Sequence, residues 1–318
     1  MLGRGVTDHW VESDPAGVWG STLDRLRGLD ALVANLECCV SDRGRRWPDK
    51  TYYFRADPSF AVGALRAAEA SVVSLANNHV LDFREPALAD TRTHLADVGV
   101  AHAGAGPDRD AALDPAVVEA GGLTVATVAF TDQFRPYAAT EDGAGTAYAV
   151  LHPSAGRTRR LVRTALERAS DHEPDLVVAS LHWGPNWVTA PGKTQQAFAR
   201  WLVDRGVDVV HGHSAHVLQG VEVYRSRPII YDAGDFVDDY IHKEGLHNKR
   251  SALFELVVTD GSLAELRVVP VEIEDETATL ADEDATAWVR ETMRARSDPF
   301  GTTVEKTDEG LSLPLGGE

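Results

Sequence analysis

The sequence predicts an α/β fold, and three observations support this prediction. Short apolar runs typical of buried strands alternate with helical patterns up to about residue 210. Beyond residue 220 the apolar runs follow one another closely, which indicates antiparallel strands joined by tight turns. Polar side chains, several of them histidines, follow the apolar runs, as expected where an α/β protein binds a ligand. We therefore expect one α/β domain built on more than one sheet.

The amino-terminal part contains two predicted buried strands with polar ends. Residues 1–6 read as the end of a strand that runs into a loop, and a helical pattern lies around 21–29. The apolar run 31–37 ends in Glu37, and the run 71–76 ends in Asn77-Asn78-His79. Asp57-Pro58 opens a helix to residue 68, because Asp is a good N-cap and Pro fits the first turn.

The alternation continues through the centre of the chain. A helix starts at Glu85-Pro86, and Gly121-Gly122 is expected to form the hairpin turn between strands 117–119 and 123–130. Residues 131–147 lack periodicity and are expected to form a long loop over a site. The next expected elements are a strand at 100–103, a helix at 157–169, a strand at 175–181, a helix at 194–205 and a strand at 207–210 that leads into the loop 211–216.

The last part of the sequence is divided into a group of strands and an acidic tail. Strands are expected at 221–224, 228–231, 252–259 and 263–271, and a last helix at 285–296. From residue 271 onward there are 13 Asp and Glu against 4 Lys and Arg, a net charge of −9 out of −18. We therefore predict a domain over residues 1–272 and a solvated, acidic carboxyl-terminal tail over 273–318 that holds the helix.

Composition excludes several classes of protein. With 43% hydrophobic and 25% charged residues, the chain has the balance of a soluble globular protein. Its net charge of −18 argues against nonspecific binding to nucleic acid or to an anionic membrane. No segment has the ~20 apolar residues of a transmembrane span, and no signal peptide is recognisable. Cys38 and Cys39 are adjacent, so a disulfide between them is strained, and we expect a cytoplasmic protein.

Groups able to bind a metal stand at four predicted strand ends. They are Glu37, Asn78 with His79, His182, and His213 with His216. Because the carboxyl ends of neighbouring strands meet, we expect these groups to converge. Imidazole, carboxylate and amide ligands without a thiolate are typical of a catalytic ion more than of a structural zinc. The alternative for residues 211–216 is a solvated polar loop.

Several motifs resemble the CapA family of capsule-synthesis proteins, also called poly-γ-glutamate synthesis proteins. They occur in order over about residues 1–270 and include Asn35-Leu36-Glu37, Ser74 to His79 followed by Leu81-Asp82, His182-Trp183-Gly184, Gly212 to Gln219, Val221 to Tyr224, and Pro228 to Tyr231 with Gly234-Asp235-Phe236. The resemblance implies a four-layer α/β/β/α sandwich of metallophosphoesterase type with mixed sheets. It also implies two divalent ions, with Mn, Zn, Fe, Ca and Mg as candidates.

The resemblance also assigns roles to residues. It implies that the metals are held by Glu37, Asn78, His79, His182, His213 and His216. Asp82 and Glu222 are then expected to orient histidines, with Asn35 beside Glu37. The alternatives are a helix N-cap for Asp82 and a strand-surface carboxylate for Glu222. His79, His182 and Asp235 are the candidate catalytic groups.

Three positions depart from the family pattern. The family has a strand ending in Gly-Asp just before the position of Met1, and that Asp looks like a metal ligand. Its absence here implies either a start set too far downstream, which we favour, or an impaired first metal site. Asp232 and Asp235 stand in the family's Ser-Leu-Gly-Asn-Phe segment and add two carboxylates near the expected site, with surface-loop acids as the alternative. His211 replaces an apolar residue, and its role is open.

Three functions follow from this reading. The first is a metal-dependent hydrolase that cuts a phosphoester or a γ-glutamyl amide. The second is a non-hydrolytic role in making or exporting poly-γ-glutamate, and the third is metal-dependent epimerisation of a peptide. The expected partner is a small molecule, a peptide or polyglutamate. The sequence leaves the oligomeric state open.

Overall fold

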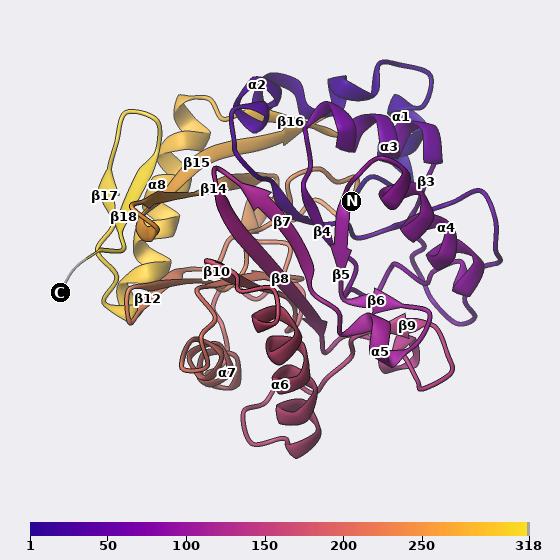
Figure 1. Ribbon diagram of the computed structural model, residues 1–318. Coiled ribbons are helices and arrows are strands. Elements are labelled where there is room, and N and C mark those ends of the chain that lie inside the picture. The colour runs from indigo at the N-terminus through magenta and orange to yellow at the C-terminus, as the bar shows by residue number, and fades with distance from the viewer. Residues whose placement is uncertain (317–318) are drawn as a thin grey trace.

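The computed structural model describes residues 1–316 and confirms an α/β fold with several sheets (Figure 1). The main helices are α1 (Gly5–Trp10), α2 (Leu23–Arg27), α3 (Pro58–Ala67), α4 (Arg84–Asp97), α5 (Arg109–Ala112), α6 (Gly156–Ser170), α7 (Lys193–Val203) and α8 (Glu283–Ser297). Short 3-10 helices are η1 (Pro15–Thr22), η2 (Arg135–Tyr137), η3 (Glu244–Leu246) and η4 (Asp298–Phe300). No helix within these 316 residues combines the length and the apolar character that a membrane span requires.

The largest sheet has six strands and a mixed topology. Its order is β12–β13–β11–β10–β8–β7, formed by β12 (Val221–Tyr224), β13 (Arg227–Ile230), β11 (Val209–His213), β10 (Leu176–His182), β8 (Leu123–Thr131) and β7 (Ala116–Ala120). The four central strands are parallel, and β7 and β12 pair antiparallel at the edges. The expected antiparallel pairing of β12 with β13 is confirmed, and β13 also pairs parallel with β11, which joins this hairpin to the large sheet.

Side chains alternate between the two faces of this sheet, as the period of two residues requires. On β10, Ala179 and Leu181 pack with buried residues of α6 and α7. Leu176 and Val178 point to the opposite face, where they join a core with the third sheet and α8. Figure 1 shows α6 and α7 together on one side of the sheet, and β14 (Arg250–Thr259) and β15 (Ser262–Glu274) on the other. The sheet is therefore covered on both faces, which explains its nearly continuous apolar strands.

A smaller parallel sheet lies beside the edge of the large one. It has the order β1–β4–β5, formed by β1 (Val33–Asn35), β4 (Val72–Ser74) and β5 (Ala101–Ala103). On β4, Val73 packs into the core that includes α3, whereas Val72 packs with Ala103 and with Ala129 of β8. Two-residue pairs complete this region: β2 (Cys39–Val40) with β3 (Arg55–Ala56), and β6 (Ala105–Gly106) with β9 (Gly145–Thr146).

The third sheet is antiparallel and includes the carboxyl-terminal segment. Its strands are β14 (Arg250–Thr259), β15 (Ser262–Glu274), β16 (Thr277–Leu280), β17 (Glu305–Lys306) and β18 (Leu311–Pro314). The predicted boundary at residue 272 falls inside β15. Val289 and Met293 of α8 and Leu311 and Leu313 of β18 are buried in the core between this sheet and the six-stranded one. Residues 273–316 are thus part of the fold and not a solvated tail, and residues 317 and 318 lie outside the described part.

The amino-terminal helices pack against this carboxyl-terminal sheet. The helix η1 lies beside β16, and the backbone N–H of Leu280 donates to Ser21 Oγ over 2.8 Å. Arg25 of α2 donates to Glu255 of β14 through Nε at 2.5 Å. Residues 1–6 were expected to end a strand. Instead α1 begins at Gly5, whose backbone N–H donates to Asp239.

Several local predictions are confirmed by the structure. Asp57 caps α3, since its Oδ1 accepts from the N–H groups of Ser59 at 2.9 Å and Phe60 at 3.1 Å. Gly121 and Gly122 turn β7 into β8 with φ values of +56° and +82°, a region that L side chains disfavour. The segment 131–147 is largely irregular, with η2 and β9 as its short elements.

His102 of β5 is half-buried, and Arg92 Nε donates to its Nε2 over 3.2 Å. Burial, reinforced by the neighbouring Arg92 charge, lowers the pKa of His102 to about 4. The ring is therefore neutral in the folded chain at neutral pH.

We expect Met293→Ala to lower the free energy of unfolding by about 2–5 kcal/mol, because it leaves a cavity between α8 and the two sheets. Urea denaturation followed by circular dichroism measures this change. Glu291→Ala, at an exposed position of the same helix, is the control. Equal effects of the two substitutions would show that residues 273–316 do not contribute to the cooperative fold.

We expect the His102→Gln variant to lose less stability than the parent chain on acidification from about pH 7 to about pH 5. The folded pKa of His102 lies below the unfolded one, so the unfolded state binds the proton first and stability falls as the pH drops through this window. The difference should be roughly 1–2 kcal/mol in urea titrations at the two pH values. Parallel pH profiles of the two proteins would contradict it.

Candidate functional site

The histidines of the site are brought together by two neighbouring strands. In the parallel pairing of β10 with β11, His182 stands opposite His213 and Ser180 opposite His211. These four side chains lie on one face of the sheet. Val178 and Val209, two residues before Ser180 and His211, lie on the same face and join the apolar core. His211 and His213, expected in a loop, are therefore on β11 itself, because the strand continues to the end of the register with β10.

Hydrogen bonds link these side chains in a row. Nδ1 of His182 lies 2.9 Å from Nδ1 of His213, and Nε2 of His213 lies 3.0 Å from Ser180 Oγ. The same hydroxyl lies 3.2 Å from Nδ1 of His211. Both ring nitrogens of His213 thus have protein partners, and His211 is joined to the site through Ser180 and through contact of its ring with that of His213, 5.1 Å away.

The second group of site residues comes from the ends of β1 and β4. Asn77 joins the two ends, since its amide nitrogen donates to Leu36 O at 2.9 Å and to Asn35 Oδ1 at 3.1 Å. Asn35 in turn donates to Glu37 Oε2 at 3.1 Å, which is the place expected for it beside Glu37. Asn77 was not among the predicted site residues, although it belongs to the motif that contains Asn78 and His79.

Glu37 connects the two groups. Its Oε1 lies 3.7 Å from Nε2 of His182, so the carboxylate at the end of the small sheet meets the histidine at the end of the large one. Both side chains are almost fully buried. Burial raises the pKa of Glu37, but its proximity to His182, and then to His216 and His79, outweighs burial, so the net shift is downward. Glu37 is therefore ionised.

Asp82 orients His79. Its Oδ2 accepts from His79 Nδ1 at 2.7 Å and from the backbone N–H of Phe54 at 2.7 Å. Its Oδ1 accepts from Tyr137 Oη at 2.8 Å and from the ammonium of Lys50. Because a carboxylate only accepts, the ring proton of His79 is on Nδ1, which leaves the lone pair of Nε2 free. The alternative role as a helix N-cap is not seen, since α4 begins at Arg84 without a side-chain cap.

His216 forms an ion pair with Asp235. His216 Nδ1 lies 2.9 Å from Asp235 Oδ1, and both side chains are at most one-tenth exposed. Burial lowers the pKa of His216, but the charge and hydrogen bond of Asp235 outweigh it and raise the pKa to about 10. Burial likewise raises the pKa of Asp235, and the imidazolium brings it down to about 2. The pair is therefore ionised in the metal-free protein.

Asp232 and Glu222 have structural partners instead of site contacts. Asp232 accepts from the backbone N–H groups of Ala215 at 2.6 Å and Gly234 at 3.0 Å, and burial raises its pKa to about 8. Glu222, expected to orient a histidine, accepts from Arg200 Nε at 2.8 Å and from Tyr231 Oη at 2.5 Å. This expectation is corrected, because Glu222 lies on β12 and ties that edge strand to α7.

The chemistry of these groups fits a divalent cation, but their positions do not yet enclose one. Burial lowers the pKa of His182 to about 4 and that of His213 well below its usual range, so both rings are neutral, the form that binds metals. Asn78 Oδ1 and Asp235 Oδ2 are buried without a hydrogen-bond partner. Within residues 1–316, however, no three His, Cys, Asp or Glu side chains are placed to hold one ion.

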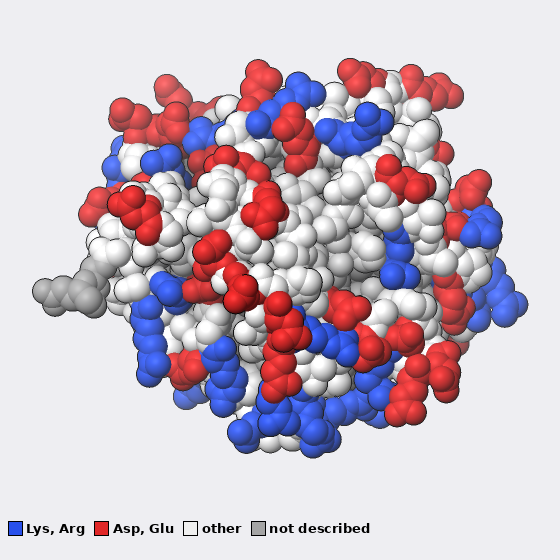
Figure 2. Space-filling view, in the orientation of Figure 1, with Lys and Arg blue, Asp and Glu red and all other residues white. Residues whose placement is uncertain are grey.

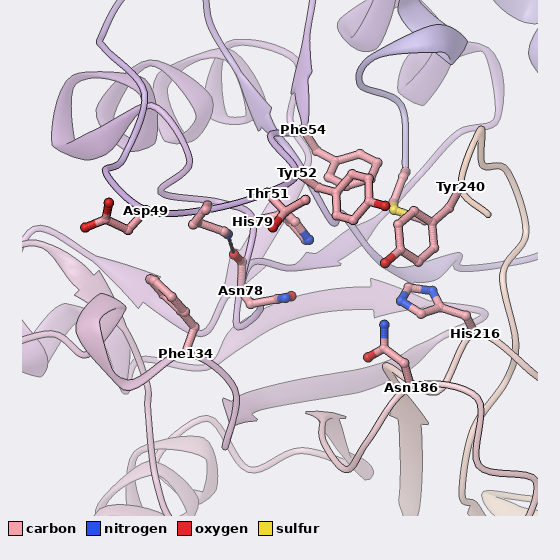
Figure 3. Close-up of a pocket in the computed structure, with 12 residues that line it drawn as sticks. Asp49, Thr51, Tyr52, Phe54, Asn78, His79, Phe134, Asn186, His216 and Tyr240 are labelled. Atoms are coloured by element: carbon pink, nitrogen blue, oxygen red, sulfur yellow. Dashed lines mark hydrogen bonds between the residues drawn. The ribbon is translucent and has the colours of Figure 1, made fainter.

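A cavity of about 250 Å³ opens beside these groups (Figure 3). Three predicted site residues line it: Asn78, His79 and His216. Figure 3 shows Tyr240 and Asn186 next to His216, with Phe134 and Asp49 at the other end. The remaining lining residues are Met1, Lys50, Thr51, Tyr52 and Phe54.

Lys50 and Tyr240 are two of the lining residues that the sequence did not indicate. Lys50 is buried, and its ammonium also donates to the carbonyl of Asn78; burial lowers its pKa, and Asp82 opposes that shift. Tyr240 stacks on Trp187 with ring centres 5.5 Å apart and lies 5.0 Å from the ring of His216. A sequence signal existed for Lys50 alone, since it ends a basic stretch, but that stretch reads as an ordinary surface loop.

Comparison with known proteins places this site in a family. The family described as bacterial capsule synthesis protein PGA_cap matches residues 1–240. The chain belongs to this family. That range includes the described site residues from Asn35 to Tyr240, so the resemblance to CapA proteins in the motifs is confirmed.

Individual relatives agree with this membership. A "Probable polyglutamine synthesis accessory protein" of Mycobacterium tuberculosis is 36% identical over 308 residues, covering 92% of this chain and 80% of that protein. The capsule biosynthesis protein CapA of Bacillus anthracis is 32% identical, covering 86% of this chain and 66% of that protein. Apart from these relatives, a solved structure of a hypothetical protein from Thermus thermophilus shows a weaker likeness, with 18% identity and a TM-score of 0.47 over 78% of this chain and 90% of that one.

We expect Asp82→Ala to lower the free energy of unfolding by about 3–5 kcal/mol. The substitution leaves the Lys50 ammonium buried without its carboxylate and removes the acceptor of three further donors. Chemical denaturation measures the loss, and Asp97→Ala, at an exposed position of α4, is the control. A loss below about 1 kcal/mol, the size of an exposed pair, would rule out this network as a stabilising element.

Proposed function

We propose that this chain acts in the synthesis of a glutamate-based capsule polymer, as a metal-dependent hydrolase of a phosphoester or a γ-glutamyl amide. The family membership supports the role in capsule synthesis. The observation that supports hydrolysis is the meeting of Glu37 with His182, next to a His79 ring that Asp82 orients. We also propose that the layers form the four-layer sandwich of metallophosphoesterases.

The residues that would hold divalent ions are Glu37, Asn78, His79, His182, His213 and His216. A bound divalent ion supplies a Lewis acid and lowers the pKa of water toward neutrality. Since His213 has protein partners on both nitrogens, loading requires this ring to give up one of them. The hydrogen bonds already present between these side chains would then determine the position from which each ligand atom approaches the ion.

Proton transfer would rely on two groups of this chain. His79 has only Nε2 to offer, because Asp82 fixes its other nitrogen as the donor, so this ring serves either as a metal ligand or as a proton acceptor and not as both at once. The carboxylate of Asp235 has one oxygen on His216 and a second, buried oxygen without a partner, which leaves it an acceptor. His182 is too enclosed for direct contact with a substrate, at 1% exposure, so its proposed contribution is to the metal.

A non-hydrolytic accessory role is the second candidate. The absence of a three-donor group among residues 1–316 and the word "accessory" in the name of the mycobacterial relative favour it. Epimerisation is the least favoured of the three functions. Of the two acids that prompted it, Asp232 accepts hydrogen bonds from backbone N–H groups, so Asp235 alone remains as an acid/base group.

We expect the purified chain to bind about two equivalents of a divalent metal and to cleave a γ-glutamyl peptide or a generic phosphodiester. His79→Ala should lower cleavage by at least about 100-fold, the size of a lost general base. His172→Ala, at an exposed position, should leave it unchanged. Metal analysis and a chromogenic assay measure both quantities.

The outcomes separate the candidates. Less than one equivalent of metal after loading with Mn or Zn, together with no cleavage, would refute the hydrolase and leave the accessory role. Uptake of deuterium at a peptide Cα without cleavage would instead indicate epimerisation.

A further inference from the structure

Three arginines near the site are held by aromatic rings and not by carboxylates. The guanidinium of Arg46 lies 5.0 Å from the centre of the Tyr53 ring, that of Arg55 4.1 Å from Phe83, and that of Arg84 5.5 Å from Trp47. Within residues 1–316, no carboxylate lies within ion-pair distance of these three arginines. Some arginines elsewhere pair with acids instead, as Arg25 does with Glu255 and Arg168 with Asp114.

This mode of contact leaves donors free. An aromatic ring engages the face of a guanidinium, so the N–H groups at its edge remain available for an acceptor. The Nε of Arg84 is buried and has no hydrogen-bond partner. A carboxylate of a ligand is a well-matched partner for such groups, because it can accept two parallel N–H bonds from one guanidinium.

The rings and cations form a continuous tract toward the cavity. Tyr53 and Phe83 contact each other with ring centres 6.2 Å apart, and Tyr53 Oη donates to the backbone carbonyl of Trp47 over 2.7 Å. Trp47 in turn contacts Tyr137 at 4.8 Å and Phe134 at 6.3 Å between ring centres. We call this set the arginine tract; it comprises Arg46, Trp47, Lys50, Tyr53, Arg55, Phe83, Arg84, Phe134 and Tyr137. It runs from the exposed Arg46 through the half-buried Arg55 and Arg84 to the buried Lys50, which lies 4.9 Å from Phe134.

A second cavity lies along this tract. It has a volume of about 400 Å³ and is lined by Gly44, Arg45, Arg84, Glu85 and Pro86. Trp47 contacts a lining residue of each cavity, Arg84 on one side and Phe134 on the other. The lining of each cavity includes one exposed carboxylate, Asp49 in the first and Glu85 in the second. Cations therefore outnumber exposed carboxylates along the arginine tract.

The tract stands out against the charge of the whole molecule. The chain carries 49 acidic and 31 basic residues, so a polyanion is repelled by most of its surface. Figure 2 shows acidic side chains scattered over the visible face and a basic group along its lower edge, where Figure 1 places α6. The α6 arginines project from a helix that covers the opposite side of the large sheet, so they do not lead to the cavity beside His79.

We infer that the arginine tract binds a carboxylate-bearing polymer, a chain of glutamate residues, and passes it to the cavity lined by His79 and His216. The repeating carboxylates of such a chain match cations placed along a path, whereas a neutral polyglutamine chain offers only amide groups. The inference rests on the proposed function for the reaction at the cavity. Binding along the tract is independent of that reaction.

Binding of a fluorescently labelled glutamate oligomer of about ten residues to the full chain tests this inference. Fluorescence anisotropy should show binding that weakens with added salt, and a glutamine oligomer of equal length should bind at least about tenfold more weakly. The double variant Arg46→Gln with Arg84→Gln should lose at least about tenfold in affinity for the glutamate oligomer. The matched control is Arg157→Gln with Arg160→Gln, which removes the same charge from exposed positions of α6.

The results discriminate clearly. Equal binding of the two oligomers, or equal losses in the two double variants, would overturn the inference. Polymer binding that needs the tract, without any cleavage of the polymer, would refute hydrolysis of a glutamyl bond and leave the tract intact. If the tract variants cleave a glutamyl polymer with unchanged kcat/KM, the role of the tract in delivering the polymer is refuted and the hydrolase is left intact.

Discussion

The buried carboxylate of Asp82 is the interaction on which the geometry of the site depends. It is fully enclosed, and a buried charge is tolerated only when donors surround it. Here the donors come from a loop, from the end of β4 and from η2, so one carboxylate holds three separate segments in register. The ring of His79 and the ammonium of Lys50 are fixed as a consequence.

A second constraint is the meeting of two sheets. Parallel strands expose their carboxyl ends at a common edge, and the chain supplies acids and amides at one edge and histidines at the other. The contact between Glu37 and His182 bridges them inside a space from which water is largely excluded. Burial keeps His182 and His213 neutral, whereas the carboxylate partner of His216 keeps that ring charged. Chemically identical side chains thus acquire different charge states from their surroundings.

Much of this was predictable from sequence, because strand ends are marked by the change from apolar to polar residues. That signal located Glu37, His79 and His182, whereas the role of Asp82 in orienting a histidine was implied by the resemblance to the CapA family. It did not show that β11 continues through His213, since histidine is as acceptable on a strand as in a loop. Nor did it reveal Tyr240 or the role of Glu222, which depend on contacts between distant segments. The net acidity of residues 273–318 concealed the apolar positions that bury α8 and β18.

The packing of η1 on β16 has a consequence for the route by which the chain folds. The hydrogen bond from Leu280 to Ser21 closes a loop of 259 residues, and contacts of such long range slow folding. During synthesis the first helices emerge long before the strand that covers them. The part of their apolar core that Val271 and Ala278 complete stays accessible to chaperones or to other nascent chains until the last third of the protein has been made.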